Sequence, residues 1–163
     1  MTVEAQAAAW FLPFVIPLCL ITAYTDLRWM KITNKTVTAL IAVFAVGGAI
    51  LLPFDEYLWR WVHLLVVLAA GIALNIGGAL GAGDAKFMAA AAPYIMLSDL
   101  SLIFWLLAAT SLSGFVAHRL VRATPLKALA PDWESWHVGN RFPMGYPLGG
   151  ALAAYLILKS LGA

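Results

Sequence analysis

Long hydrophobic stretches separated by short polar segments dominate the pattern along the chain. Six such runs are present, with approximate bounds 7–25, 36–52, 57–80, 85–97, 100–120 and 145–158. None of them shows the alternation of apolar and polar residues that is typical of a transmembrane β-strand. A backbone inside a bilayer must satisfy its hydrogen bonds internally, so unbroken apolar runs indicate helices. The pattern therefore predicts six helices.

The composition indicates that these helices lie in a membrane. Of the 163 residues, 63% are hydrophobic and 11% are charged, whereas soluble domains average about half and about a quarter. A chain of this size has too little interior to bury so much apolar surface. At about 20 residues per crossing it has room for six or seven spans and for no separate soluble domain. We therefore predict one all-α, polytopic membrane domain over residues 1–163, a bundle of about six transmembrane helices.

Positive charges predict the orientation, because Lys and Arg are retained preferentially on the cytoplasmic side. If the helices alternate in direction, Arg60 and Lys159 fall on one side and the other eight basic residues fall on the opposite side. The eight are Arg28, Lys31, Lys35, Lys86, Arg119, Arg122, Lys127 and Arg141. This asymmetry predicts that the N-terminus is outside. The segment before Trp10 contains Glu4 and no Lys or Arg, so we interpret it as a retained first span rather than a secretory signal.

Charge and cysteine content exclude several other classes of protein. A formal net charge of +2, from ten basic and eight acidic residues, provides no basic surface for nucleic acid. Cys19 is the only cysteine, which excludes an intramolecular disulfide and a multi-cysteine zinc site. His118 and His137 have no Cys or His partner at metal-ligand spacing. We therefore expect neither a metal site nor an organic cofactor.

Two acidic residues stand beside predicted spans on the cytoplasmic side. Asp26 ends the first helix, and Asp84 opens the fourth after a glycine-rich stretch at 77–83. The fourth apolar run has 13 residues, which would cover roughly 20 Å of a roughly 30 Å hydrocarbon core. One solution is that the glycine-rich turn itself enters the membrane zone and faces a wet cavity. Asp84 would then be partly buried.

A pair of carboxylates in a wet, half-buried pocket can carry out acid–base chemistry. If Asp26 and Asp84 approach each other, repulsion raises the pKa of one of them and the pair shares a proton. The ionised member can then take a proton from water while the protonated member polarises a peptide carbonyl. Taken alone, each residue also has a simpler interpretation, with Asp84 as a helix N-cap and Asp26 as a solvated flank residue.

The residues that lead to Asp84 form a motif. Positions 81–84 read Gly-Ala-Gly-Asp, with Gly81 and Gly83 on either side of one alanine, and Lys86 follows. This GxGD motif resembles that of intramembrane aspartic peptidases. The longer GxGDxK form is similar to that of bacterial type IV prepilin peptidases.

Two further segments resemble the same family. Asp26 and Arg28, followed by Ile-Thr-Asn at 32–34, are similar to the family's first-aspartate region, in which Asp and Arg precede Ile-Pro-Asn. Threonine thus replaces a proline that would rigidify the turn. Pro143 and Gly145 are similar to the Pro-x-Gly segment that opens the family's last helix. In helix count and motif order the resemblance covers nearly the whole chain.

The resemblance implies roles for these residues. Asp26 and Asp84 would form the catalytic dyad. Gly81 and Gly83 would let the backbone bend and approach the substrate, since glycine adopts positive φ without a Cβ penalty. Lys86 would tune Asp84 or contact the substrate backbone, and a lysine that snorkels to the membrane surface is an equally good interpretation. The candidate substrate-binding residues are Arg28, Asn34, Pro143 and Gly145.

Among these peptidases the chain is most similar to the short enzymes that process Flp-type prepilins, because it has no methyltransferase region and no cysteine cluster. The resemblance implies a multi-pass enzyme of the bacterial cytoplasmic membrane, in contact with lipid, that cleaves the basic leader from type IV prepilins at the cytoplasmic face. Two alternatives stay open. One is another GxGD peptidase, of preflagellin type or related to presenilin, and the other is a non-enzymatic small carrier or assembly subunit. The oligomeric state is left undetermined.

Overall fold

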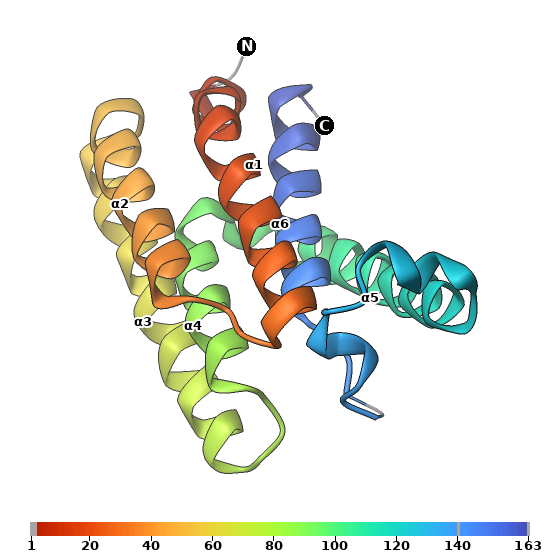
Figure 1. The fold of residues 1–163 in the computed structure, drawn as a ribbon. Helices are drawn as coiled ribbons and strands as arrows, with labels where there is room; N and C mark the ends of the chain where they lie inside the picture. The colour runs from red at the N-terminus through yellow and green to blue at the C-terminus, as the bar shows by residue number, and fades with distance from the viewer. Residues whose placement is uncertain (1–2, 140, 163) are drawn as a thin grey trace.

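Six α-helices and four short 3-10 helices make up the computed structural model, which describes residues 3–139 and 141–162 (Figure 1). The six predicted helices are therefore confirmed within these residues, and no strand is present among them. The α-helices are α1 (Val3–Trp29), α2 (Asn34–Leu51), α3 (Phe54–Ile76), α4 (Ala82–Ala91), α5 (Leu100–Ala123) and α6 (Gly145–Ser160). The 3-10 helices are η1 (Ala92–Tyr94), η2 (Leu97–Asp99), η3 (Pro125–Leu129) and η4 (Glu134–Trp136).

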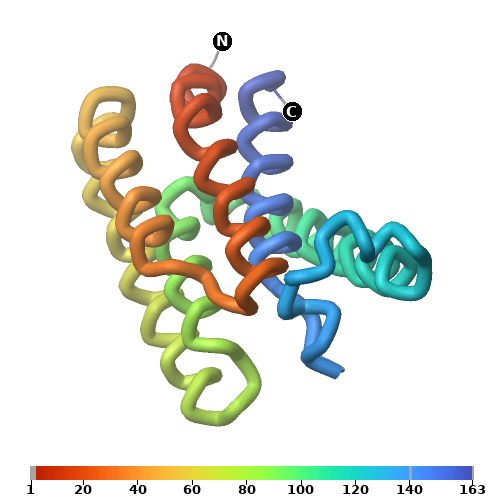
Figure 2. The backbone as a smooth tube through the Cα atoms, in the orientation of Figure 1, coloured from red at the N-terminus to blue at the C-terminus, as the bar shows by residue number. Residues whose placement is uncertain are grey.

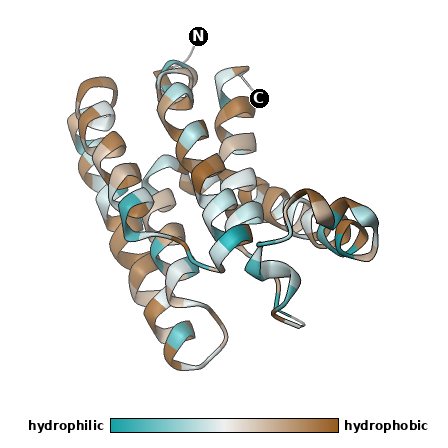
Figure 3. Ribbon diagram, in the orientation of Figure 1, coloured by the Kyte–Doolittle hydropathy of each residue, from teal (hydrophilic) through white to brown (hydrophobic). Residues whose placement is uncertain are grey.

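Four helical segments in the described part of the chain are long and apolar enough to cross a membrane. They are α1, α2, α3 and the continuous stretch Leu97–Ala123, which joins η2 to α5. The other two helices, α4 with 10 residues and α6 with 16, are shorter than a full crossing needs. Figure 3 shows hydrophobic residues predominating along α2, α3 and α5. Length and composition thus agree with an all-α membrane protein.

The chain alternates between the two ends of the molecule. In Figures 1 and 2 the α1–α2 and α3–α4 connections lie at the lower end, and segment 124–144 lies low beside them. The α2–α3 connection, the start of α1 and the end of α6 lie at the upper end. Most of the basic residues lie in these three connections or in the helix turns beside them, so we call this end the basic end.

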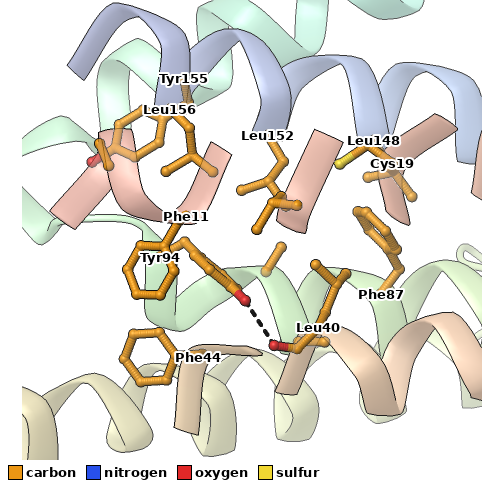
Figure 4. Close-up of a cluster of buried hydrophobic side chains, with 14 of the residues drawn as sticks. Phe11, Cys19, Leu40, Phe44, Phe87, Tyr94, Leu148, Leu152, Tyr155 and Leu156 are labelled. Carbon is orange, nitrogen blue, oxygen red and sulfur yellow. Dashed lines mark hydrogen bonds between the residues drawn. The ribbon is translucent and has the colours of Figure 1, made fainter. Parts of the chain in front are cut away.

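The buried core lies between α1, α2, α4 and α6, with η1 closing one side (Figure 4). Phe11 and Phe44 pack against Tyr94, with ring centroids 4.9 and 5.4 Å apart, and the Tyr94 hydroxyl donates a 2.7 Å hydrogen bond to the Leu40 carbonyl. This bond satisfies a polar group that the apolar core would otherwise leave unpaired. It also fixes η1 against α2.

Helices α3 and α5 flank this core and bury little of their own surface. On α5 the buried residues are Gly114 and His118, and on α3 they are Arg60 and Gly71. Figure 1 shows α5 running across the direction of the other helices and away from α2 and α3. Apolar side chains such as Trp105 remain exposed on it. Such faces are stable when lipid rather than water surrounds them.

Two acids at the other end of the molecule have basic partners. Glu56 pairs with Arg60 at 2.6 Å, and Asp99 pairs with Lys159 at 3.2 Å. Asp99 also accepts a 2.8 Å hydrogen bond from the Tyr155 hydroxyl. The contacts of Asp99 tie α6 to η2, directly before α5, and they are distinct from those of the motif residues at the basic end.

Candidate active site

Asp26 lies in the last turn of α1, with only 5% of its surface exposed. Its Oδ2 accepts a hydrogen bond from the Gly145 backbone N–H, with an N···O distance of 2.6 Å. Gly145 is the first residue of α6, so this N–H is one of the donors that a helix start leaves without an intrahelical partner. A carboxylate at this position also faces the positive end of the helix dipole. The start of α6 therefore orients Asp26.

Close packing of α1 on α6 makes this contact possible. A Cβ added to Gly145 would lie 2.7 Å from the Asp26 Cβ, which is closer than real Cβ atoms approach, and 3.0 Å from the Thr22 carbonyl oxygen, which is a tight contact. One turn further along α6, a Cβ at Gly149 would lie 3.0 Å from the Cys19 carbonyl oxygen. The two glycines thus let the helix backbones approach each other closely. Pro143, just ahead of α6, is fully buried.

Asp84 is the third residue of α4, and Gly81 occupies the N-cap position. The N-cap interpretation of Asp84 is therefore wrong, because the helix begins at Ala82, three residues earlier than the apolar run indicates. A Cβ at Gly81 would lie 2.7 Å from Asp84 Oδ2, so the carboxyl group folds back over the cap residue. An acid at this third position commonly reaches back to the cap in this way.

The glycines of the motif provide space rather than an unusual backbone conformation. Gly81 has φ of −67°, Gly83 is helical, and the positive-φ glycines of the described chain are Gly78, Gly139 and Gly162. The expectation of positive φ at Gly81 and Gly83 is therefore wrong. A Cβ at Gly83 would lie 3.3 Å from the Cβ of Ile32, in the α1–α2 connection. Glycine there allows that connection to pack directly on α4.

The two acids influence each other electrostatically. The pKa of Asp84, which lies outside the four candidate spans, is raised to about 6. Burial is the largest cause and the charge of Asp26 is the second, while the hydrogen bond from the Gly81 backbone amide opposes the shift. An effect of one carboxylate on the other requires that they lie close together in a poorly solvated place. Two side chains 58 positions apart in the sequence thus lie near enough to influence each other at the basic end.

Lys86 and Asn34 link α4, which carries Asp84, to the start of α2. The Lys86 Nζ donates to the Asn34 Oδ1 at 3.2 Å, joining α4 to the first residue of α2. Thr33 precedes it with φ of −79° and ψ of 143°, values that proline also adopts. Its hydroxyl accepts a 3.3 Å hydrogen bond from the Thr36 N–H and so caps α2. Threonine therefore preserves the extended turn and adds a helix cap.

Arg28 has a different environment from the other candidates. Its guanidinium stacks over the Trp29 ring at 4.8 Å and hydrogen-bonds the Tyr24 hydroxyl. Both aromatic rings are exposed. The structure thus places Arg28 in a surface aromatic cluster at the end of α1.

Thr22 is a buried neighbour of Asp26 that sequence reasoning missed. It lies one turn earlier on α1, is fully buried, and its Oγ1 has no hydrogen-bond partner. The signal in the sequence is a polar residue four positions before an acid on an otherwise apolar helix. Within the described residues, no group of three His, Cys, Asp or Glu side chains could hold a metal ion.

The comparisons with known proteins agree with the motif. Residues 13–118, more than half of the chain, match the sequence profile of the type IV leader peptidase family. The matched region contains both Asp26 and Asp84. Comparisons with curated proteins and with solved structures found no match. The extent of the profile match shows that the chain belongs to the type IV leader peptidase family.

Proposed function

We propose that the protein is an intramembrane aspartic endopeptidase that removes the basic leader of Flp-type prepilins at the cytoplasmic face of the inner membrane. Membership of the type IV leader peptidase family supports a peptidase that acts on a prepilin. The observation that carries the aspartic mechanism is the electrostatic effect of the buried Asp26 on the half-buried Asp84. The basic residues gathered at the same end of the molecule support a cytoplasmic active site.

The environments of the two acids suggest different roles. The Gly145 N–H stabilises negative charge on Asp26, which suits it to accept a proton from the attacking water. Asp84, with its raised pKa, holds the proton and donates it to the oxygen of the scissile carbonyl. Water adds to the carbonyl carbon and forms a neutral tetrahedral intermediate. Asp26 then protonates the leaving nitrogen, Asp84 takes a proton from a hydroxyl of the intermediate, and the C–N bond breaks.

The test is cleavage of a prepilin in cells. The chain, or its Asp84→Asn form, is co-expressed with a Flp-type prepilin, and the N-terminus of the pilin is read by mass spectrometry. We expect a shortened pilin with the unmodified chain alone. Cleavage of a preflagellin or of an unrelated membrane peptide in preference to the prepilin would contradict the proposal that a prepilin is the substrate. No cleavage of any of them by the inserted protein would support a carrier or assembly role.

The pKa of Asp84 predicts a loss of activity in alkaline solution. Below pH 6 Asp84 is protonated and can donate, and above pH 6 it is ionised. The rate of cleavage at low substrate is therefore expected to fall about tenfold for each pH unit above this value. The measurement is kcat/KM of the solubilised enzyme from pH 4.5 to 9. A rate that stays constant from pH 6 to 9 would contradict Asp84 as the proton donor.

The bond between Lys86 and Asn34 predicts coupled effects of substitution. Lys86→Met and Asn34→Ala each remove one partner, so each is expected to lower the cleavage rate about tenfold by loosening α4 against α2. The double variant is expected to be little worse than either single variant, because both remove the same interaction. Lys35→Met changes a neighbouring exposed lysine and is the matched control. Fully additive effects in the double variant would show that the two residues act separately.

A further inference from the structure

A cavity lined mainly by apolar and aromatic side chains lies beside the end of α5. Its volume is about 410 Å³, it is open on one side, and its lining comes from the end of α5, from η3 and η4, and from the first turn of α6. Its lining includes Leu27 and Tyr146. These are the residues that directly follow Asp26 and Gly145, the two partners of the 2.6 Å hydrogen bond. Helices α1 and α6, which hold this hydrogen bond, therefore also contribute to the lining of the cavity.

His118 contributes the buried polar group of this cavity. Only 6% of its surface is exposed, and neither ring nitrogen has a hydrogen-bond partner. Its ring stacks on Trp136 with centroids 4.7 Å apart, and Phe142 meets it edge-on at 5.8 Å. Leaving a buried imidazole unsatisfied is unfavourable, and in native proteins such a group normally has a partner. The imidazole offers one donor and one acceptor, which matches the carbonyl and amide of a peptide backbone.

The wall of the cavity is held in place before any ligand binds. The guanidinium groups of Arg119 and Arg122 donate to the Gly139 carbonyl at 3.2 and 2.7 Å, which fastens segment 124–142 to α5. The Trp136 indole N–H donates to the Ala130 carbonyl at 2.9 Å. These bonds orient the aromatic side chains toward one another. A pocket that is already ordered loses less conformational entropy on binding than a flexible one, so the ligand binds more tightly.

The charge and the lining of the cavity favour the apolar segment of a prepilin over its basic leader. Arg119 and Arg122 follow His118 on α5 and would repel a basic leader. The cavity is otherwise lined by apolar and aromatic side chains, including Leu129 and Trp133. An uncharged, apolar segment therefore fits it better than the leader does.

We propose that this cavity binds the substrate segment that follows the scissile bond, with an apolar side chain between Leu129 and the tryptophans and the peptide backbone hydrogen-bonded to His118. The proposal rests on the proposed function and specifies which side of the cut the cavity holds. It makes His118 a binding residue, separate from the acids that carry out the chemistry.

Cross-linking locates the bound segment directly. Leu129, with 85% of its surface exposed, is replaced by cysteine in the full-length Asp84→Asn chain, where Cys19 is buried. Prepilins that carry one cysteine, either before or after the cut, are then oxidised with this chain in membranes. We expect disulfide formation at least about five times greater for positions after the cut. Equal or greater cross-linking to the leader, or none at all to a bound prepilin, would overturn the proposal.

Two controls make the result specific. Ile76→Cys places an equally exposed thiol, at 82% exposure, at the end of α3, and it is expected to give no preference between the two prepilin positions. In the active chain, His118→Phe keeps an aromatic ring against Trp136 and removes both nitrogens. It is expected to raise KM about tenfold and to leave kcat within about twofold.

The kinetic outcomes separate this proposal from the proposed function. If the unmodified chain cuts no prepilin, the proposed function itself fails and the cavity proposal fails with it. If the unmodified chain cuts prepilin and His118→Phe leaves KM unchanged, only the cavity proposal is wrong. A decrease in kcat at constant KM would also contradict it, because that result indicates a disturbed dyad rather than weaker binding.

Discussion

Replacing either Asp26 or Asp84 by asparagine is expected to lower the rate of prepilin cleavage at least about a thousandfold. Asparagine cannot take a proton from water or donate one to the carbonyl oxygen at neutral pH, so each substitution removes one of the two proton-transfer groups. The side chain keeps nearly the same shape, and its amide oxygen can still accept the Gly145 N–H. The variants should therefore insert into the membrane and fold. Their loss of activity should appear as a lower kcat.

The measurement is the cleavage rate of purified variants together with their abundance in the membrane. The double variant is expected to be no slower than the slower single variant, because the two acids act as a unit. Asp55→Asn replaces an exposed acid at the opposite end of the molecule and should leave the rate unchanged. Cleavage by either dyad variant at more than about a tenth of the normal rate would contradict the proposed mechanism.

The second large effect is expected for Gly145→Ala. The added methyl group would lie 2.7 Å from the Asp26 Cβ, which belongs to the rigid part of that residue. Helices α1 and α6 must then separate, and the 2.6 Å hydrogen bond to Asp26 lengthens or breaks. A displacement of this size at the reacting groups is expected to lower kcat about a hundredfold. Overpacking is also expected to lower the free energy of unfolding by about 1–3 kcal/mol.

Gly150→Ala is the matched control on the same helix. A Cβ there would lie 3.4 Å from the Thr110 Cγ2, which is ordinary van der Waals contact. Its rate and unfolding free energy should remain close to those of the unmodified chain. The measurements are the cleavage rate and the thermal unfolding of Gly145→Ala and Gly150→Ala. Equal rates for the two variants would show that the contact between Gly145 and Asp26 is not needed for catalysis.

Hydropathy predicts the helices well and their ends less well. The first run was predicted over 7–25, whereas α1 extends from Val3 to Trp29. The reason is that a helix continues through polar residues as long as its backbone hydrogen bonds are made, so the end of the apolar pattern does not mark the end of the helix. Likewise α4 begins at Ala82, ahead of its apolar run, and places Asp84 inside the helix.

The two acids of the candidate site can also be predicted from the sequence. Asp26 and Asp84 stand out because acids beside apolar runs are costly and because one of them ends a GxGD motif. The roles of the motif glycines cannot be predicted in the same way. Whether Gly81 and Gly83 serve a positive φ or a close approach depends on what packs against them, and in the folded chain those neighbours are Asp84 and Ile32.

By itself the sequence determined the all-α membrane architecture, the alternation of its connections and the two acids, because hydropathy and short motifs are properties of neighbouring residues. Only the tertiary structure decided that the Gly145 N–H binds Asp26 across 119 positions and that His118 lies unpaired in an aromatic cavity. Those contacts depend on how closely α1, α5 and α6 pack. Helix packing is set by the side-chain volumes of both partners together, which no single segment specifies.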